Sequence, residues 1–167
     1  MRKLLIISAL GVVAVSAQAD VFNLVGVGTY TLGSGGYTTT ENIVAQMTPF
    51  TLDTLNFAGT YSGNGAVGTM VFTGTGGSVT LSFTSGDFQY DSSGNASGLA
   101  GAWTFVSGTG SYSSYTTGSG TFGATYNAAS NNYSSTTLSG NIQAVPEPAT
   151  LAVLGLGALA LRRRKRK

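Results

Sequence analysis

The chain has 167 residues, of which 42% are hydrophobic and only 8% are charged, and its formal charge is +2. All eight basic residues lie at the two ends, so the stretch from Asp20 to Val145 holds five carboxylates, no basic side chain and a formal charge of −5. A body without Lys or Arg has no means of neutralising phosphates, which argues against nucleic acid as a partner.

The same inventory limits the chemistry that the chain can perform. It contains no Cys and no His. Ser-His-Asp and Cys-His catalysis, zinc sites built on His or thiolate, and Schiff-base lysines all need residues that residues 20–145 lack. Carboxylates remain, and two of them could in principle hydrolyse a glycosidic bond. We expect no catalysis, no cofactor and no metal site, with a small barrel enzyme that uses carboxylates as one alternative.

The first 19 residues have the order of a secretory signal peptide. Two basic residues precede an apolar core over residues 4–15, and the small residues Ala17 and Ala19 follow, directly before Asp20. This order predicts an N-terminal signal helix, passage through the secretion translocon, and cleavage by signal peptidase between Ala19 and Asp20. The exported domain then comprises residues 20–145.

Alternation of apolar and polar residues predicts strands at the start of this domain. The run from Val21 to Leu32 predicts a first strand that ends at Gly33-Ser-Gly-Gly36. Residues 37–47 are mixed, and their second part, residues 41–47, fits either a strand or one helical turn.

After Pro49 the alternation resumes, but its phase changes between Leu52 and Leu55. One extra residue in a strand produces such a change, so the sequence predicts a β-bulge near Asp53 and Thr54.

The middle of the domain predicts hairpins. Gly63-Asn-Gly65 favours the positive φ values that a tight hairpin turn needs. Residues 67–73 and 79–84 form the next two expected strands, joined by Gly74-Thr-Gly-Gly77. A turn at Ser92-Ser-Gly-Asn95 follows a short stretch near residues 87–91.

The last part of the domain is the most regularly patterned. Trp103 and Phe105 alternate with polar or small residues, a Gly-Thr-Gly turn and Gly118-Ser-Gly120 follow, and residues 122–126 continue as a strand. A last strand is expected from Tyr133 to Val145. Roughly eight strands with short turns place the domain in the all-β class, as a single antiparallel β-barrel or β-sandwich.

Two groups of residues in the domain could bind a ligand. Asp91-Ser-Ser-Gly-Asn95 offers oxygen atoms that could hold calcium, although an Asx-type turn explains the same residues. Trp103, Tyr112 and Tyr115 could stack on sugar rings if they are exposed together, although the pattern favours positions in a barrel interior or in cross-strand pairs.

The last 22 residues form a segment of three parts. A Pro146-Glu147-Pro148 triplet precedes an apolar run over residues 149–161, and six basic residues end the chain: Arg162, Arg163, Arg164, Lys165, Arg166 and Lys167. At about 1.5 Å per helical residue the apolar run reaches about 20 Å, short of the roughly 30 Å hydrocarbon core of a bilayer. The run therefore predicts a C-terminal hydrophobic helix that anchors the chain weakly and temporarily.

The flanks of this helix predict its orientation. The basic residues are retained on the cytoplasmic side of the membrane, which leaves the rest of the chain outside. Pro146 and Pro148 hold the backbone extended just before the helix, so the triplet is an accessible strip for a processing enzyme.

This segment, residues 146–167, resembles the PEP-CTERM sorting signal of Gram-negative bacteria, which the membrane protease-transferase exosortase recognises. Similar tails have also been labelled ice-binding protein C-terminal domains, a label that implies nothing about ice. The resemblance implies export across the inner membrane, a transient membrane anchor, and processing by exosortase near Pro146, Glu147 and Pro148. It implies release or transfer to the cell surface or the extracellular matrix.

We therefore expect a non-enzymatic, exported cell-surface or matrix protein, structural or associated with exopolysaccharide and biofilm. A carbohydrate-binding β-module is the alternative from another class, and the carboxylate enzyme is the third.

Overall fold

The computed structural model describes residues 19–145, so the signal helix and the C-terminal helix expected from the sequence lie outside the described residues. The strands are β1 (Ala19–Val21), β2 (Leu24–Leu32), β3 (Gly36–Gln46), β4 (Thr54–Ser62), β5 (Gly65–Gly74), β6 (Gly77–Ser85), β7 (Gln89–Tyr90), β8 (Ala96–Gly108), β9 (Tyr115–Asn127) and β10 (Tyr133–Ala144), and the two short 3-10 helices are η1 (Gly110–Tyr112) and η2 (Ala128–Ser130). In residues 19–145 no helix has the length and apolar character needed to cross a membrane.

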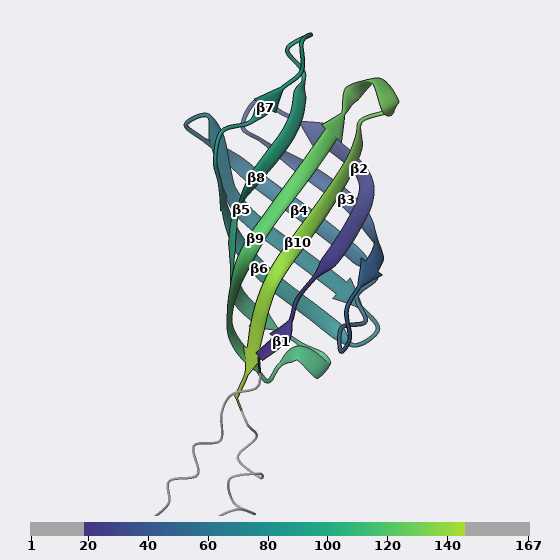
Figure 1. Cartoon of the computed structure of the whole chain (residues 1–167), viewed down its shortest axis with the longest axis vertical. Coiled ribbons are helices and arrows are strands. Elements are labelled where there is room, and N and C mark those ends of the chain that lie inside the picture. The colour runs from purple at the N-terminus through teal and green to yellow at the C-terminus, as the bar shows by residue number, and fades with distance from the viewer. Residues whose placement is uncertain (1–18, 146–167) are drawn as a thin grey trace, which may run out of the picture. The chain divides into compact units, whose positions relative to one another are not determined.

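Eight of these strands close into an antiparallel barrel (Figure 1). Strands β2, β3, β4, β5 and β6 pair in that order, β6 pairs with β8, and β8 pairs with β9. Strand β10 pairs with β9 on one side and with β2 on the other, which completes the ring. The expected all-β class is confirmed, and the barrel rather than the sandwich is the architecture.

The side chains alternate between the inside and the outside of the barrel. On β6, for example, Val79, Leu81 and Phe83 are buried while their neighbours in sequence lie outside. An eight-stranded barrel has an interior just wide enough to be filled by such side chains. Aromatic rings fill much of it, and Phe57 stacks on Phe83 with ring centroids 4.4 Å apart.

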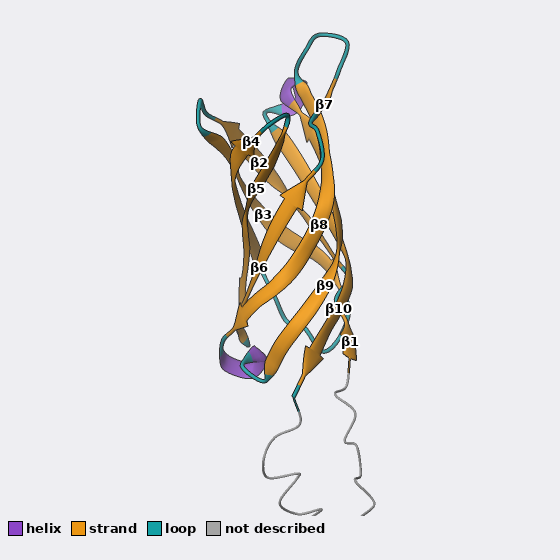
Figure 2. Ribbon diagram, turned by 90° about the vertical axis from the view of Figure 1, so that its left-hand side faces the viewer, coloured by secondary structure: helices purple, strands orange, loops and turns teal. Residues whose placement is uncertain are grey.

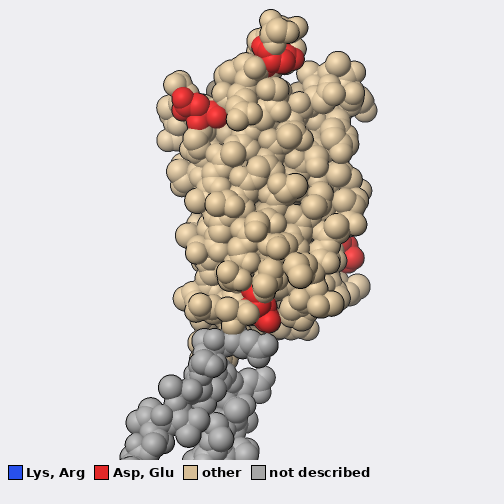
Figure 3. Space-filling view, in the orientation of Figure 1, with Lys and Arg blue, Asp and Glu red and all other residues tan. Residues whose placement is uncertain are grey.

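The outer face of the barrel carries mostly hydroxyl and amide side chains rather than charges. Hydroxyl groups pair across neighbouring strands, as in Thr54 with Thr73 and Ser82 with Thr104. Figure 3 shows few carboxylates and no basic residue on the face of the described part that it presents.

Trp103 is accommodated by two glycines on neighbouring strands. A Cβ atom on Gly120 would lie 2.6 Å from Cζ2 of Trp103, and a Cβ on Gly140 would lie 2.4 Å from the same atom. The indole Nε1 donates a hydrogen bond to the Thr121 carbonyl at 3.1 Å. Gly118-Ser-Gly120, expected between two elements, therefore lies inside β9, where it makes room for the ring.

One end of the barrel, which we call the closed end, is covered by the connection between β3 and β4, residues 47–53. Phe50 of this connection packs edge-on against Phe22, with centroids 4.8 Å apart. Gln46 ties the connection down, because its side chain both donates to and accepts from the backbone of Leu52.

This arrangement corrects the sequence prediction at residues 53–54. Strand β4 begins at Thr54, and its pairing with β3 and β5 is regular, so the change of phase comes from the connection and not from a β-bulge. The expected strand Val21–Leu32 is likewise split, because Phe22 turns fully into the core between β1 and β2.

Both ends of the described chain lie at the closed end. Strand β1 pairs with the end of β10, with Ala19 opposite Gln143. The opposite end, which we call the mouth, is formed by residues 33–35, 63–64, 86–95 and 128–132, and part of it projects beyond the strands in Figure 2. The last described residue of the chain and the mouth therefore lie at opposite ends of the barrel.

Candidate binding site

The mouth of the barrel holds a pocket of about 680 Å³. Small-molecule sites in proteins usually measure about 300–1,000 Å³, so the size fits an organic ligand. Its lining comes from three of the connections at the mouth and the adjoining strand ends: Tyr30, Thr31, Leu32, Tyr61, Gly63, Asn64, Gly65, Phe88, Tyr90, Gly94, Asn95, Ala96, Ala128 and Asn132.

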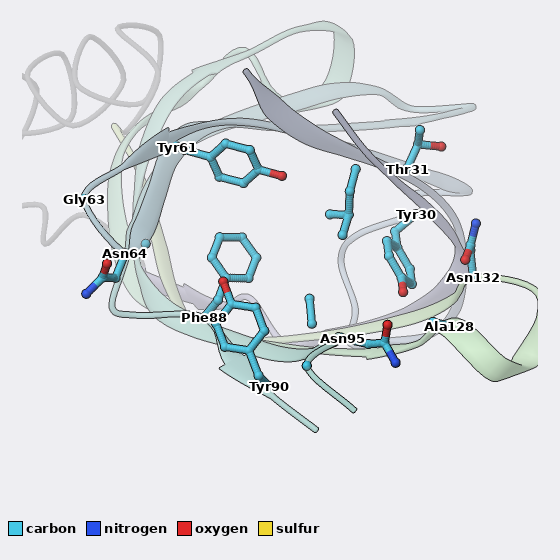
Figure 4. Close-up of a pocket in the computed structure, with 14 residues that line it drawn as sticks. Tyr30, Thr31, Tyr61, Gly63, Asn64, Phe88, Tyr90, Asn95, Ala128 and Asn132 are labelled. Carbon is cyan, nitrogen blue, oxygen red and sulfur yellow. The ribbon is translucent and has the colours of Figure 1, made fainter. Parts of the chain in front are cut away.

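Aromatic rings dominate the inner wall of this pocket. Figure 4 shows the rings of Tyr30, Tyr61 and Phe88 turned into the opening. Tyr61 and Phe88 meet edge to face with centroids 5.8 Å apart, and both contact the buried ring of Tyr37 below them. These contacts hold Tyr61 in place although 40% of it is exposed.

The rim of the pocket carries uncharged polar side chains. Asn64, Asn95 and Asn132 surround the opening (Figure 4). None of the lining residues is charged. The site can therefore offer hydrogen bonds and aromatic faces, but no ion pair.

The turn at Asp91-Ser-Ser-Gly-Asn95 shapes one side of the mouth. The Asp91 carboxylate accepts hydrogen bonds from the backbone N–H groups of Ser93 and Asn95 and from the Asn95 side chain. These bonds, those of Asn95 first, hold the pKa of Asp91 below its usual value. This is the Asx-type arrangement, and in residues 19–145 no group of three acidic, His or Cys side chains gathers to hold a metal ion.

Beneath the floor of the pocket lies a layer of buried polar side chains around Glu41. Glu41 is 1% exposed, and Oε1 accepts a hydrogen bond from the Thr136 hydroxyl at 2.9 Å. Within the described residues its other oxygen has no hydrogen-bond partner, and neither do four other buried hydroxyl groups of the barrel interior: those of Tyr37, Thr39, Tyr126 and Ser134.

The sequence of β2 makes room for this carboxyl. Gly28 pairs with Glu41 on one side and with Ser134 on the other, so no side chain separates the two. A Cβ atom on the next inward position, Gly26, would lie 2.5 Å from Oε2 of Glu41. The two glycines thus let the carboxyl reach across β2 to Thr136 on β10.

Burial raises the pKa of Glu41, and the neighbouring hydroxyls of Ser134 and Thr136 oppose that shift only in part. Burial also raises the pKa of Tyr126 and of Tyr37, the latter with a further contribution from Tyr126 itself. Because residues 20–145 contain no basic side chain, Glu41 has no ion-pair partner in the barrel.

The structure places the three aromatic residues considered for sugar stacking inside the core. Trp103 is 1% exposed, and Tyr112 and Tyr115 are also buried, at the closed end. The phenol of Tyr115 donates a hydrogen bond to Asp20 beside it. Their faces contact protein instead of solvent, so these three rings are not available to a sugar.

The remaining sequence candidates lie at or beyond the edge of the described residues. Ala19 and Asp20 belong to β1 at the closed end. Ala17, the Pro146-Glu147-Pro148 triplet and the basic residues that follow it lie outside residues 19–145.

The aromatic residues of the mouth leave no local signal in the sequence. Tyr30, Tyr61 and Phe88 lie far apart in the sequence and line one pocket only in the folded barrel. Glu41 did leave a signal, since it occupies an inward position of an alternating strand, where an acid is rare.

Comparison with known proteins identifies one segment of the chain. Residues 144–167 match the PEP-CTERM protein-sorting motif. No curated protein and no solved structure matches the chain. The motif begins at the last residue of β10, so the barrel leads directly into the sorting signal.

Proposed function

We propose that this chain, which carries a PEP-CTERM sorting motif and is therefore an exported protein sorted by exosortase, is a non-catalytic component of the cell surface or extracellular matrix. The sorting motif is the observation that carries the proposal. The barrel supports it, because a hydroxyl-rich outer face with few charges suits a hydrated polysaccharide environment.

The fold also suits display. Val145 leaves the barrel at the closed end, where its N–H donates to the Ser114 carbonyl at 3.0 Å. Val145, the last described residue before the triplet, therefore lies at the closed end, and the mouth lies at the other end of the barrel. A chain attached through its C-terminus would present the mouth outward.

Fractionation of the native host tests this proposal. Replacing Pro146, Glu147 and Pro148 together with Ala should move the protein from the surface and matrix fractions to the inner membrane. Thr150→Ala, just beyond the triplet, is the matched control and should leave the distribution unchanged. Equal amounts of both variants in the matrix fraction would contradict sorting through the triplet.

A carbohydrate-binding module is the second candidate, and the exposed aromatic rings at the mouth favour it. Tyr61 and Tyr90 line the mouth pocket and are partly exposed, on a part of the chain that lacks basic residues. A glycan array probed with the processed protein tests this candidate, and failure to retain any glycan would remove it.

The positions of the carboxylates weigh against the enzyme alternative. Glu41 is the one buried carboxyl in residues 19–145, whereas Asp53 is exposed at the closed end and Asp87 and Asp91 are exposed in the connection over residues 86–95 at the mouth. Glycosidases generally need two carboxyl groups about 5–10 Å apart across one bond. Release of reducing ends from a polysaccharide by the protein, abolished in Glu41→Gln, would contradict this part of the proposal.

A further inference from the structure

We propose that the mouth pocket binds the terminal residues of a neutral saccharide chain. The inference deepens the carbohydrate-binding candidate and rests on it: it names the site, the charge class of the ligand, and the part of the polymer that enters.

The aromatic wall supplies the first requirement of such a site. Sugar rings present C–H groups on their faces, and these pack on aromatic rings. Tyr61 is held by Tyr37, which stacks on it with centroids 6.5 Å apart and an interplanar angle of 25°. A ring that is already fixed loses little conformational entropy when a ligand covers its exposed face.

The rim supplies the hydrogen-bonding groups. Asn95 uses its side-chain N–H on Asp91, which leaves its carbonyl oxygen free to accept. Within the described residues, the side-chain amides of Asn64 and Asn132 make no hydrogen bond to protein. Amides can both donate to and accept from sugar hydroxyls.

The absence of charge in the pocket favours a neutral ligand. The lining residues carry no charge, and the nearest acidic turn, at Asp91, is satisfied by its own backbone. An acidic polysaccharide would meet a domain of formal charge −5 without a single basic partner. Repulsion and desolvation would therefore oppose its binding.

The depth of the pocket selects a chain end. Below Tyr30 and Phe88 the core is filled by buried rings, among them Tyr37 and Tyr126, and these rings are in contact with one another. Phe22 and Phe50 close the opposite end. A polymer cannot pass through the barrel, so a terminus enters the pocket while the rest of the chain stays outside.

Two pairs of variants separate the pocket from its surroundings. Tyr61→Ala removes a ring of the pocket, and Tyr133→Ala removes a ring of almost equal exposure, 42% against 40%, that does not line it. Asn132→Gly deletes a rim amide, and Asn131→Gly is its control, because both residues have a φ of 55° that glycine adopts readily.

The experiment is calorimetric titration of the processed protein, recovered from its host, with neutral and acidic oligosaccharides of increasing length. The neutral series comprises glucose, galactose and N-acetylglucosamine oligomers, and the acidic series comprises uronic acid oligomers. Thermal unfolding of each variant confirms that it is folded.

The proposal predicts binding of at least one neutral series, with an affinity that stops rising after about two or three rings. Tyr61→Ala and Asn132→Gly should each weaken it by about tenfold, and their controls by less than about twofold. Tighter binding of the acidic series, or affinity that keeps rising along the chain, would overturn it.

Other outcomes separate this inference from the functions on which it rests. If all four variants bind the neutral oligosaccharides equally well, the mouth pocket is not the binding site, and the protein is a carbohydrate-binding module with another site. Absence of all binding would overturn both, while the surface and matrix function would still be decided by fractionation.

Discussion

Glu41 is the residue whose surroundings differ most from those of an ordinary glutamate. Its carboxyl lies inside the barrel, bonded to Thr136 and facing the hydroxyl groups of Tyr126 and Ser134, without a cation in residues 20–145. A buried carboxylate without a counter-charge is costly, so the protonated form is favoured up to a higher pH than in water.

This carboxyl makes the stability of the barrel depend on pH. The folded pKa of Glu41 is raised, so its contribution is complete below the unfolded value of about 4.3 and is lost as the pH rises through the folded pKa. Tyr126, which lies near Glu41, and Tyr37 beside Tyr126 have raised pKa values and stay protonated across this range. The free energy of unfolding should therefore fall as the pH increases from about 4.

Denaturant unfolding at a series of pH values measures this slope. Glu41→Gln should flatten it, because glutamine keeps the shape of the side chain and cannot ionise. Asp53→Asn, which changes an exposed carboxyl, should leave the slope in place. An identical pH dependence in the wild type and Glu41→Gln would show that Glu41 ionises as freely in the folded chain as in the unfolded one.

A second residue-scale prediction concerns the glycines around Trp103. Gly120→Ala places a methyl group 2.1 Å from the Ser139 carbonyl oxygen and 2.6 Å from Trp103, so it should lower the free energy of unfolding by about 1–3 kcal/mol. Gly123→Ala is the control on the same strand, since its nearest atom, Thr137 Oγ1, is 3.6 Å away. Equal stabilities of the two variants by thermal unfolding would contradict this packing.

Among the elements, the connection over residues 47–53 covers the closed end of the barrel, and we call it the plug. Thr51 is tied to η1 through the Tyr112 hydroxyl, which accepts from the Thr51 N–H at 2.8 Å and lies 3.0 Å from its side-chain oxygen. The stacking of Phe50 on Tyr112 adds a second contact between the same segments.

Tyr112→Phe should loosen this plug without opening the barrel. Loss of the hydroxyl leaves the Thr51 N–H without its partner, which costs about 1–2 kcal/mol. Hydrogen exchange should therefore speed up in residues 47–53 and stay unchanged at the mouth. Tyr133→Phe, on an exposed ring, is the control; uniform acceleration over the whole barrel would mean that the plug and the strands unfold as one unit.

The elements also show what sequence patterns can and cannot establish. The hairpin at residues 63–65 was predicted, but its turn residues were not: the Asn-Gly pair was expected to supply positive φ at both central positions, whereas Ser62 pairs with Gly65 and Gly63 alone in this turn has positive φ, 63°. Residues 41–47 were ambiguous because Ile43 and Val44 are adjacent apolar residues, one half-buried and one exposed, at the end of a strand that only tertiary pairing defines.

The choice between barrel and sandwich could not be made from the pattern, because both bury alternate side chains. Closure depends on the pairing of β10 with β2, across more than one hundred residues, and no local signal encodes that contact. The pocket follows from closure, which explains why its aromatic residues escaped prediction while the terminal sorting signal, a continuous stretch, did not.

At the scale of the whole molecule, the distribution of charge has a direct chemical consequence. Trypsin cleaves after Lys and Arg, and residues 20–145 contain neither. The processed protein should therefore survive trypsin even when fully unfolded in urea, whereas chymotrypsin should degrade the unfolded form at its many aromatic residues. A ladder of tryptic fragments from this region would contradict the sequence itself.

The two proposals concern opposite ends of the barrel. The sorting signal leaves the barrel at the closed end, and the pocket opens at the mouth. Under the two proposals, attachment through the C-terminus would leave the mouth to bind a saccharide.

The intact mass of the protein in the surface and secreted fractions of its host, with and without exosortase, decides whether the tail is a sorting signal. We expect a chain that begins at Asp20 and ends near Pro146 to Pro148 only when exosortase is present. A chain that still carries Lys167 in both strains would contradict it and leave the tail as an ordinary membrane anchor.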